Sequence, residues 1–262
     1  MEKHGNLAAM QRQEFDVLVI GGGILGCGIA RDAAMRGLRT ALVEKEDFGY
    51  GTTSRSTRLI HGGLRYLELY DFALVHEALH ERETLLRVAP HLVHGVPFVT
   101  PVYQGDRWSP LLVRSGMVLY DLLSWGKSLP AHRMLSPREV LQLEPGLRPE
   151  GLRGGALYYD GQVSFPERLC IENLLSAREY GACFANHAPA RELVREEGRV
   201  VGAVVEETHT GCRYTLRARV VVNAAGPWAD EVAHLAAPNT PPHLRRTKGI
   251  HIVVPSFTQH AV

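Results

Sequence analysis

Consecutive glycines after a short apolar run constrain the fold of this chain more than any other feature of its sequence. Residues 15–20 are apolar and rich in β-branched side chains, which is typical of a buried parallel strand. The run is followed by the spacing G-x-G-x-x-G, formed by Gly21, Gly22, Gly23 and Gly26. Residues 24–36 then have helical apolar spacing, and Gly37 stands where a helix commonly ends. Such a strand–turn–helix lets the backbone approach a diphosphate, which binds at the helix N-terminus.

A second apolar run supports this interpretation. Residues 40–43 predict another buried strand, which completes a β-α-β unit of about 30 residues and ends at Glu44. A carboxylate at this point accepts hydrogen bonds from a ribose diol and repels a 2′-phosphate. The glycines and Glu44 together predict a dinucleotide site, although the spacing alone does not distinguish FAD from NAD.

The rest of the chain predicts an α/β fold with an antiparallel insertion. Helices are predicted at residues 71–88, 110–125, 137–143 and 166–179. Strands are predicted at residues 96–103, 155–159 and 250–254, and an antiparallel meander at residues 188–194, 200–207 and 212–222. The dipeptide Asp160-Gly161 indicates a turn. In the first helix the apolar stripe includes Val75 and Leu79, and Arg82 is expected off it.

Composition excludes several classes of protein. The 262 residues are 45% hydrophobic with a net charge of +1, so a globular protein is expected and nucleic acid is not expected as a partner. The four cysteines are far apart without metal-ligand spacing, which predicts reduced thiols and no metal site. No secretory signal is recognised, and no run reaches the roughly 18 apolar residues of a spanning helix. Residues 110–125 could lie on a membrane surface, although an apolar helix face more often belongs to the core.

A second candidate segment, residues 49–63, is rich in glycine, hydroxyl side chains and arginine. This composition suits a loop around a second phosphate and a flavin ring, and it suits an ordinary polar surface loop equally well. Composition alone leaves both interpretations open.

The residues that follow resemble a known family. Residues 59–68 read Leu-Ile-His-Gly-Gly-Leu-Arg-Tyr-Leu-Glu and resemble the signature of FAD-dependent, quinone-linked glycerol-3-phosphate dehydrogenases, in the D-amino-acid-oxidase-like flavoprotein superfamily. Further segments similar to that family lie at residues 74–92, 222–228 and 248–255. The resemblance implies a Rossmann-like FAD-binding domain interleaved with an antiparallel-sheet substrate domain. The FAD-binding domain is expected at residues 14–80 and 156–236, the substrate domain at residues 81–155 and 237–262, and a flexible leader at residues 1–13.

The resemblance also implies roles for particular residues. Binding of FAD is expected from Gly21, Gly22, Gly23, Gly26, Glu44, Lys45, Thr53, Ser54, Arg58, Leu59, His61, Gly62, Ala225 and Gly226. Arg65 and Tyr66 are expected to bind the substrate, since a guanidinium suits a phosphate. His61, Arg65 and His251 are the candidate catalytic residues, and the alternative for either histidine is a structural hydrogen bond. Arg58 stands where relatives often carry Lys, which keeps the charge.

The activity implied is oxidation of sn-glycerol 3-phosphate to dihydroxyacetone phosphate, with hydride transfer from C2 to flavin N5 and electrons passed to quinone or oxygen. A cytoplasmic location, or a peripheral one on the inner face of the cell membrane, is expected. Three other functions stay open: an amino-acid or amine oxidase in which Arg65 pairs with a carboxylate, a non-catalytic flavin-binding remnant, and a nicotinamide dehydrogenase. The substrate domain of the family normally continues further, so the chain is expected to be the N-terminal part of a longer protein.

Overall fold

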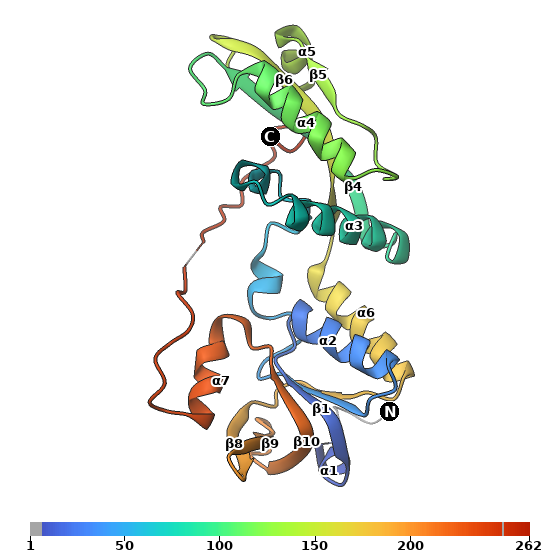
Figure 1. The fold of residues 1–262 in the computed structure, drawn as a ribbon, viewed down its shortest axis with the longest axis vertical. Coiled ribbons are helices and arrows are strands. Elements are labelled where there is room, and N and C mark those ends of the chain that lie inside the picture. Colours follow the sequence, from blue (N-terminus) through green and yellow to red (C-terminus); the bar gives the residue numbers. More distant parts are fainter. Residues whose placement is uncertain (1–6, 248) are drawn as a thin grey trace. The chain divides into compact units, whose positions relative to one another are not determined.

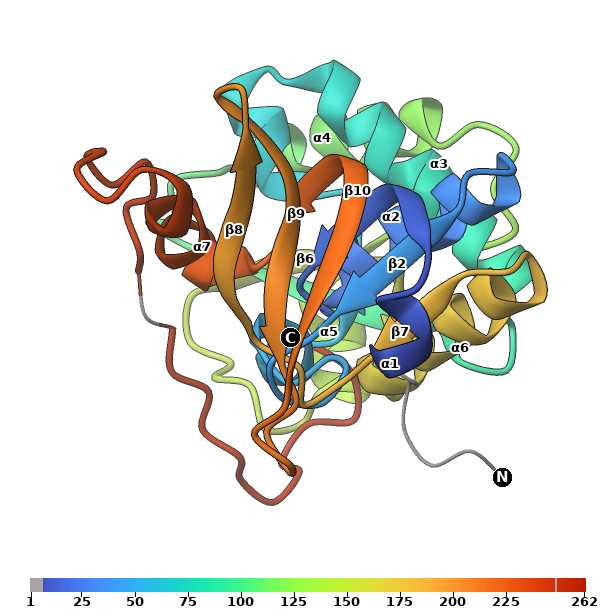
Figure 2. The same ribbon diagram turned by 90° about the horizontal axis from the view of Figure 1, so that it is seen from below.

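The computed structural model describes residues 7–247 and 249–262, with the backbone but not the side chain of Arg65. These residues form two compact units, each with its own sheet (Figures 1 and 2). The first unit contains the described residues up to Ser56 and Phe165–Ile250, and the second contains Thr57–Ser164 and His251–Val262. The chain therefore leaves the first unit after its opening β-α-β segment and returns to it more than 100 residues later.

The first unit is built on a six-stranded sheet with the order β7-β2-β1-β10-β9-β8. Its strands are β1 (Glu14–Ile20), β2 (Thr40–Val43), β7 (Cys183–Ala185), β8 (Ala190–Glu196), β9 (Arg199–Glu206) and β10 (Arg213–Asn223). Its helices are α1 (Leu7–Met10), α2 (Ile24–Met35), α6 (Pro166–Glu179) and α7 (Ala229–Ala236), with short 3-10 helices η1 (Thr52–Arg55) and η3 (Gly226–Trp228). The strands β7, β2, β1 and β10 are parallel, and β10, β9 and β8 form the antiparallel meander. The predicted α/β class is confirmed.

Successive side chains of β1 enter different cores, because they point to opposite faces of the sheet. Val19 packs with Cys27 of α2 and Leu174 of α6 in one core. Leu18 and Ile20 belong to a second core, which includes residues of the meander and of α1. Figure 1 shows α2 and α6 side by side over the sheet, and their contact is extensive. Packing of α2 on β1 therefore holds the start of this helix at the end of the strand.

The carboxyl ends of three parallel strands lie level with one another. The register pairs Ile20 of β1 with Val43 of β2 on one side and with Asn223 of β10 on the other. The segments that leave these three ends therefore begin at one edge of the sheet. In open α/β sheets ligands bind at this edge.

The second unit is an antiparallel sheet of order β3-β6-β4, with β5 also paired to β6. Its strands are β3 (Leu59–Ile60), β4 (Val93–Tyr103), β5 (Arg133–Leu135) and β6 (Leu152–Val163). Its helices are α3 (Phe72–Val88), α4 (Pro110–Leu123) and α5 (Pro137–Leu143), with the 3-10 helix η2 (Leu64–Leu69). Val75 and Leu79 of α3 are buried against Tyr120 of α4, and Val140 of α5 packs with Val99 of β4.

These units differ from the domain boundaries expected from the sequence. Residues 57–80 and 156–164 lie in the second unit, because β3 pairs with β6 and α3 packs on α4. The described residues of the range 237–250 group with the first unit. The assignment of cofactor and substrate binding to separate domains stays a prediction.

Strand β6 corrects the prediction of a turn at Asp160-Gly161. The strand runs unbroken from Leu152 to Val163, and Gly161 pairs with Ile60 of β3. A Cβ atom at Gly161 would lie 2.8 Å from the carbonyl oxygen of Ile60. The glycine therefore admits a close neighbouring strand instead of forming a turn.

Two further predictions are wrong for the described residues. The expected leader includes α1, whose Leu7 and Met10 are buried in the core of the first unit, whereas residues 1–6 lie outside the described part of the chain. Residues 250–254 form no strand, and Val253 is 96% exposed. Apolar β-branched residues favour a strand only where a sheet edge accepts them, and the residue of this region that pairs with β4 is Ala261.

Candidate cofactor site

The glycine turn after β1 interlocks with the segment after β10. Gly21 has a φ of +114°, and a Cβ atom there would lie 2.4 Å from the carbonyl oxygen of Ala224 and 2.9 Å from the Cα atom of Ala225. A Cβ atom at Gly26 would lie 1.9 Å from the carbonyl oxygen of Gly21. Only glycine fits at these two positions without a backbone shift. The turn is therefore pressed between α2 and the end of β10.

The start of α2 presents backbone donors beside this turn. Gly23 is the N-cap residue and supplies no side chain to cap the helix. Thr53 takes up one donor, since its hydroxyl accepts the N–H of Ile24 at 3.1 Å. The N–H groups of Leu25 and Gly26 precede the first intrahelical hydrogen bond, which Cys27 donates to Gly23. These groups and the helix dipole form a site for a phosphate.

Glu44 is held against the same turn by two backbone amides. One carboxylate oxygen accepts the N–H of Gly22 at 2.6 Å, and the other accepts the N–H of Glu46 at 2.9 Å. Each carboxylate oxygen has two lone pairs, so each keeps the capacity for one more hydrogen bond. A ribose diol can use this remaining capacity, which fits the predicted role of Glu44.

The loop after β2 closes the edge of the site. The N–H of Gly49 donates to the carbonyl oxygen of Gly22 at 2.9 Å. The Lys45 ammonium lies 3.9 Å from the ring centroid of Trp228, and the same ring would lie 2.9 Å from a Cβ atom at Gly51. The contacts of Trp228 join this loop to the segment after β10, and no role for Trp228 was expected from the sequence. The signal for Trp228 was an aromatic residue directly after Ala225 and Gly226, which were expected to bind FAD.

The first unit thus brings together most of the predicted cofactor-binding residues. They are Gly21, Gly22, Gly23, Gly26, Glu44, Lys45, Thr53, Ser54, Ala225 and Gly226. Ser54 itself bonds locally, because its hydroxyl donates to the carbonyl oxygen of Tyr50 at 2.8 Å.

The remaining predicted residues belong to the second unit. Arg58 has a left-handed backbone with a φ of +61°, and its guanidinium donates to the carbonyl oxygen of Ser164 at 3.0 Å. Leu59 pairs with Gln162 of β6. His251 is exposed and lies in no helix or strand, and most of the residues that follow it are likewise exposed and outside any helix or strand. Lys248, which belongs to the resembling segment, lies outside the described residues.

His61 and Tyr66 flank a tight turn at Gly62 and Gly63. The N–H of Gly63 donates to His61 Nδ1 at 2.9 Å, so the proton of the neutral imidazole is on Nε2. Gly63 is left-handed, and a Cβ atom there would lie 2.3 Å from the ring of Tyr66. The backbone of Arg65 lies in η2 between them, and its side chain is outside the described part of the structure.

A buried polar cluster behind this turn was missed by sequence reasoning. Arg82 is 0% exposed and forms an ion pair with Asp160, which also accepts the hydroxyl of Tyr120. The prediction that Arg82 lies off the apolar stripe of α3 is therefore wrong. The signal was its spacing, since Arg82 follows Val75 by seven residues and Leu79 by three.

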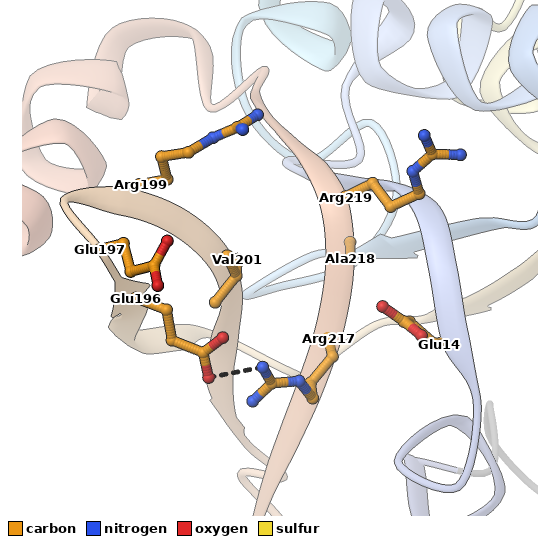
Figure 3. Close-up of a pocket in the computed structure, with 8 residues that line it drawn as sticks. All are labelled: Glu14, Glu196, Glu197, Arg199, Val201, Arg217, Ala218 and Arg219. Atoms are coloured by element: carbon orange, nitrogen blue, oxygen red, sulfur yellow. Dashed lines mark hydrogen bonds and ion pairs between the residues drawn. The ribbon is translucent and has the colours of Figure 1, made fainter.

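A cavity of about 800 Å³ also lies in the first unit, and its lining includes none of the residues of the glycine turn. Figure 3 shows the residues that line it. The pairing of β9 with β10 ends at Gly202 and Arg217, and the hollow lies where the two strands diverge. Its lining includes Glu14, the first residue of β1, so it lies toward the amino ends of the parallel strands. An ion pair of 2.5 Å between Glu196 and Arg217 crosses the lining. This cavity is distinct from the candidate cofactor site.

Neither a metal centre nor a membrane span is found in the described part of the chain. Among the residues that the structure describes, no group of three or more His, Cys, Asp and Glu side chains is arranged to hold a metal ion. Within residues 7–247 and 249–262, no helix is both long and apolar enough to cross a membrane. The four cysteines are free thiols, and a hydrogen bond to Cys170 together with burial raises the pKa of Cys27.

Comparison with known proteins decides the family. A family model described as FAD dependent oxidoreductase matches residues 16–262. This chain belongs to that family. FAD is the cofactor of the family, and the interlocked glycines and Glu44 fit its adenosine diphosphate half.

Proteins with sequences similar to this chain are named as enzymes of glycerol phosphate. A glycerol-3-phosphate dehydrogenase of Synechocystis sp. is 46% identical, over 96% of this chain and 47% of the relative. An alpha-glycerophosphate oxidase of Streptococcus pneumoniae is 41% identical, over 96% of this chain and 42% of the relative. The chain thus spans about half the length of the curated relatives it matches.

A solved structure of this family has the same fold. The glycerol-3-phosphate dehydrogenase from Bacillus halodurans complexed with FAD superposes with a TM-score of 0.69 and is 32% identical. The match covers 88% of this chain and 38% of that one. The similarity therefore extends over both compact units described above.

Proposed function

We propose that the protein to which this chain belongs oxidises sn-glycerol 3-phosphate to dihydroxyacetone phosphate with bound FAD. The observation that carries the proposal is the interlocked turn, in which Gly21 and Gly26 leave no room for side chains at the start of α2. The names of the similar dehydrogenase and oxidase supply the substrate class. The FAD-dependent family supplies the redox chemistry.

Each part of the first unit has a proposed task in holding FAD. The N–H groups at the start of α2 bind the diphosphate, and the remaining lone pairs of Glu44 accept the ribose hydroxyls. Ala225 and Gly226 close the site from the end of β10, where backbone contact with Gly21 fixes their position. When bound, FAD supplies the acceptor of the C2 hydride.

Residues of the second unit are proposed to handle the substrate. Arg65 pairs with the phosphate, since a guanidinium binds its oxygens in a bidentate manner, and Tyr66 lies beside it on η2. His61 and His251 are the candidates for the proton of the C2 hydroxyl. With Nδ1 accepting the N–H of Gly63, the neutral imidazole of His61 donates a hydrogen bond from Nε2, which suits binding of the C2 oxygen and leaves His251 to accept the proton. Arg58, Leu59 and Gly62 are proposed to line the flavin.

The proposal extends to the electron acceptor, a membrane quinone. The support is helix α4, which keeps an apolar face on the surface of the second unit. Its exposed apolar residues are Leu111, Leu112, Val118 and Leu122, with Trp125 just beyond the helix. Leu111 and Trp125 are 73% and 82% exposed. A helix with such a face can lie in the interface of a membrane with its axis parallel to the surface.

Anaerobic titration of the FAD-loaded, full-length protein tests the activity. Glycerol 3-phosphate is expected to bleach the flavin absorption, and glycerol without the phosphate is expected to leave it unchanged. Bleaching by a D-amino acid or sarcosine instead would assign the protein to the amine-oxidising branch. A flavin that no glycerol phosphate reduces would refute the proposal.

A further inference from the structure

Three buried side chains of the second unit hold the backbone of Gly62. The hydroxyl of Tyr120 accepts the N–H of Gly62 at 2.9 Å and donates to the carboxylate of Asp160 at 2.9 Å. The guanidinium of Arg82 pairs with the same carboxylate. Burial and the neighbouring carboxylate raise the pKa of Tyr120, so this hydroxyl keeps its proton and donates it. The hydrogen bonds therefore run in one direction, from Gly62 through Tyr120 to Asp160.

The side chains around Gly62 leave no room for a Cβ atom and so restrict the position of its backbone, as the hydrogen bond to Tyr120 does. A Cβ atom at Gly62 would lie 2.4 Å from Leu79 Cδ2 and 2.6 Å from the hydroxyl oxygen of Tyr120. The backbone therefore lies directly against α3 and α4. The next amide, that of Gly63, donates to His61 Nδ1 at 2.9 Å. Two successive amides thus fix the turn and the imidazole together.

The residue types of this cluster indicate that it holds a neighbouring backbone group in place instead of contributing general stability. Burying an ion pair costs desolvation energy, and well-packed apolar side chains commonly give equal or greater stability. Two nitrogens of Arg82, Nε and Nη2, are buried without a hydrogen-bond partner among the described residues. General stability therefore does not account for these groups, whereas holding the Gly62 amide in place requires a polar acceptor at the position of Tyr120.

We propose that Tyr120, supported by Asp160 and Arg82, is a positioning residue for His61. By holding Gly62, it keeps the Gly63 amide directed at Nδ1 and so fixes both the orientation of the imidazole and the nitrogen that carries its proton. The catalytic consequence rests on the function proposed above, in which His61 acts beside the flavin. The geometric claim concerns the second unit alone.

Tyr120→Phe tests the claim, with Tyr158→Phe as its matched control. The ring of Tyr158 lies 6.2 Å from that of Tyr120 in the same unit, but its hydroxyl bonds Thr100 instead of the turn. In the ¹⁵N-labelled chain, Tyr120→Phe is expected to speed hydrogen exchange of the Gly62 amide about tenfold, which corresponds to roughly 1.4 kcal/mol. The imidazole ¹⁵N shifts of His61 are expected to move toward those of a mixture of tautomers. Tyr158→Phe is expected to change neither.

Kinetics of the FAD-loaded, full-length protein test the consequence. Tyr120→Phe is expected to lower kcat for glycerol 3-phosphate about tenfold with little change in KM, because the ground-state contacts to the substrate are kept. An enzyme that is inactive before mutation refutes the proposed function, and the nuclear magnetic resonance result still decides the positioning. If Tyr120→Phe does not fold, Asp160→Asn, which keeps an acceptor for the tyrosine, is expected to give the same shifts to a smaller extent. The proposal is overturned if Tyr120→Phe and Asp160→Asn keep the wild-type Gly62 exchange rate and His61 shifts, or if Tyr158→Phe changes both as much as Tyr120→Phe does.

Discussion

Two glycines of α2, only two positions apart, are expected to respond in opposite ways to the same mutation. A Cβ atom at Gly26 would lie 1.9 Å from the carbonyl oxygen of Gly21, whereas a Cβ atom at Gly28 meets nothing within 4 Å. Replacing glycine by alanine inside a helix gains roughly 0.5–1 kcal/mol at either position, because the unfolded chain loses conformational freedom. Only at Gly26 does the new methyl group collide with backbone.

The difference between the two variants isolates the cost of that collision. The shared gain in helix propensity cancels, and Gly26→Ala must also move the Gly21 turn or the helix by about 1 Å, which costs roughly 1–3 kcal/mol. Gly26→Ala is thus expected to unfold more easily than Gly28→Ala by about that amount. A displaced turn also no longer fits a diphosphate, so the dissociation constant for FAD is expected to rise at least about tenfold.

Chemical unfolding followed by circular dichroism and fluorescence titration with FAD measure the two effects. Gly28→Ala is expected to match or exceed the stability of the unmodified chain and to bind FAD with the same affinity. If Gly26→Ala proves as stable as Gly28→Ala and binds FAD equally well, the assigned contact between α2 and the Gly21 turn does not govern the site, and the reasoning fails.

Two predictions concern the second unit. Arg82→Met leaves a buried carboxylate without its cation and is expected to reduce the free energy of unfolding by about 3 kcal/mol. The control is Arg87→Met, an exposed position on the same helix, which should change the free energy of unfolding by less than about 0.5 kcal/mol. Equal urea midpoints for the two variants would contradict the buried ion pair. The double variant Leu122→Ser/Trp125→Ser is expected to weaken sedimentation with anionic lipid vesicles at least about tenfold, because it removes apolar area from the exposed face of α4. Val253→Ser serves as its control, because Val253 is apolar, even more exposed and outside α4. Unchanged sedimentation of the double variant would exclude α4 as the membrane contact.

Local signals were sufficient to predict the opening β-α-β segment and the meander of the first unit, but not α1, β7 or α7. Residues 15–44 combine a β-branched strand, a glycine turn, a helix ending before Gly37 and a second strand, and each boundary is set by neighbours in sequence. The same holds for the meander, whose turn at Glu197 and Gly198 has left-handed backbone at both residues. Elements specified by nearby residues could therefore be recognised one at a time.

The features that were missed depend on partners distant in sequence. Arg82 and Asp160 are 78 residues apart, and each alone reads as a solvent-facing or turn residue. Gly161 reads as a turn until Ile60 is known to pass beside it. The same limit applies to the site, where the glycine motif was recognisable but the packing of Trp228 against Lys45 and Gly51 was not.

The position of β1 between β2 and β10 has a consequence for how the protein is made. A ribosome releases the glycine turn early, yet the carbonyl of Ala224 that presses against Gly21 leaves the exit tunnel only after some 200 more residues have been synthesised. Until then one edge of β1 stays open, and the turn lacks the backbone that shapes it. Capture of the nucleotide is thus expected late in synthesis, after residues 57–164 of the second unit have emerged. Chaperones that shield an open strand have their longest window of contact at the very start of the nascent chain.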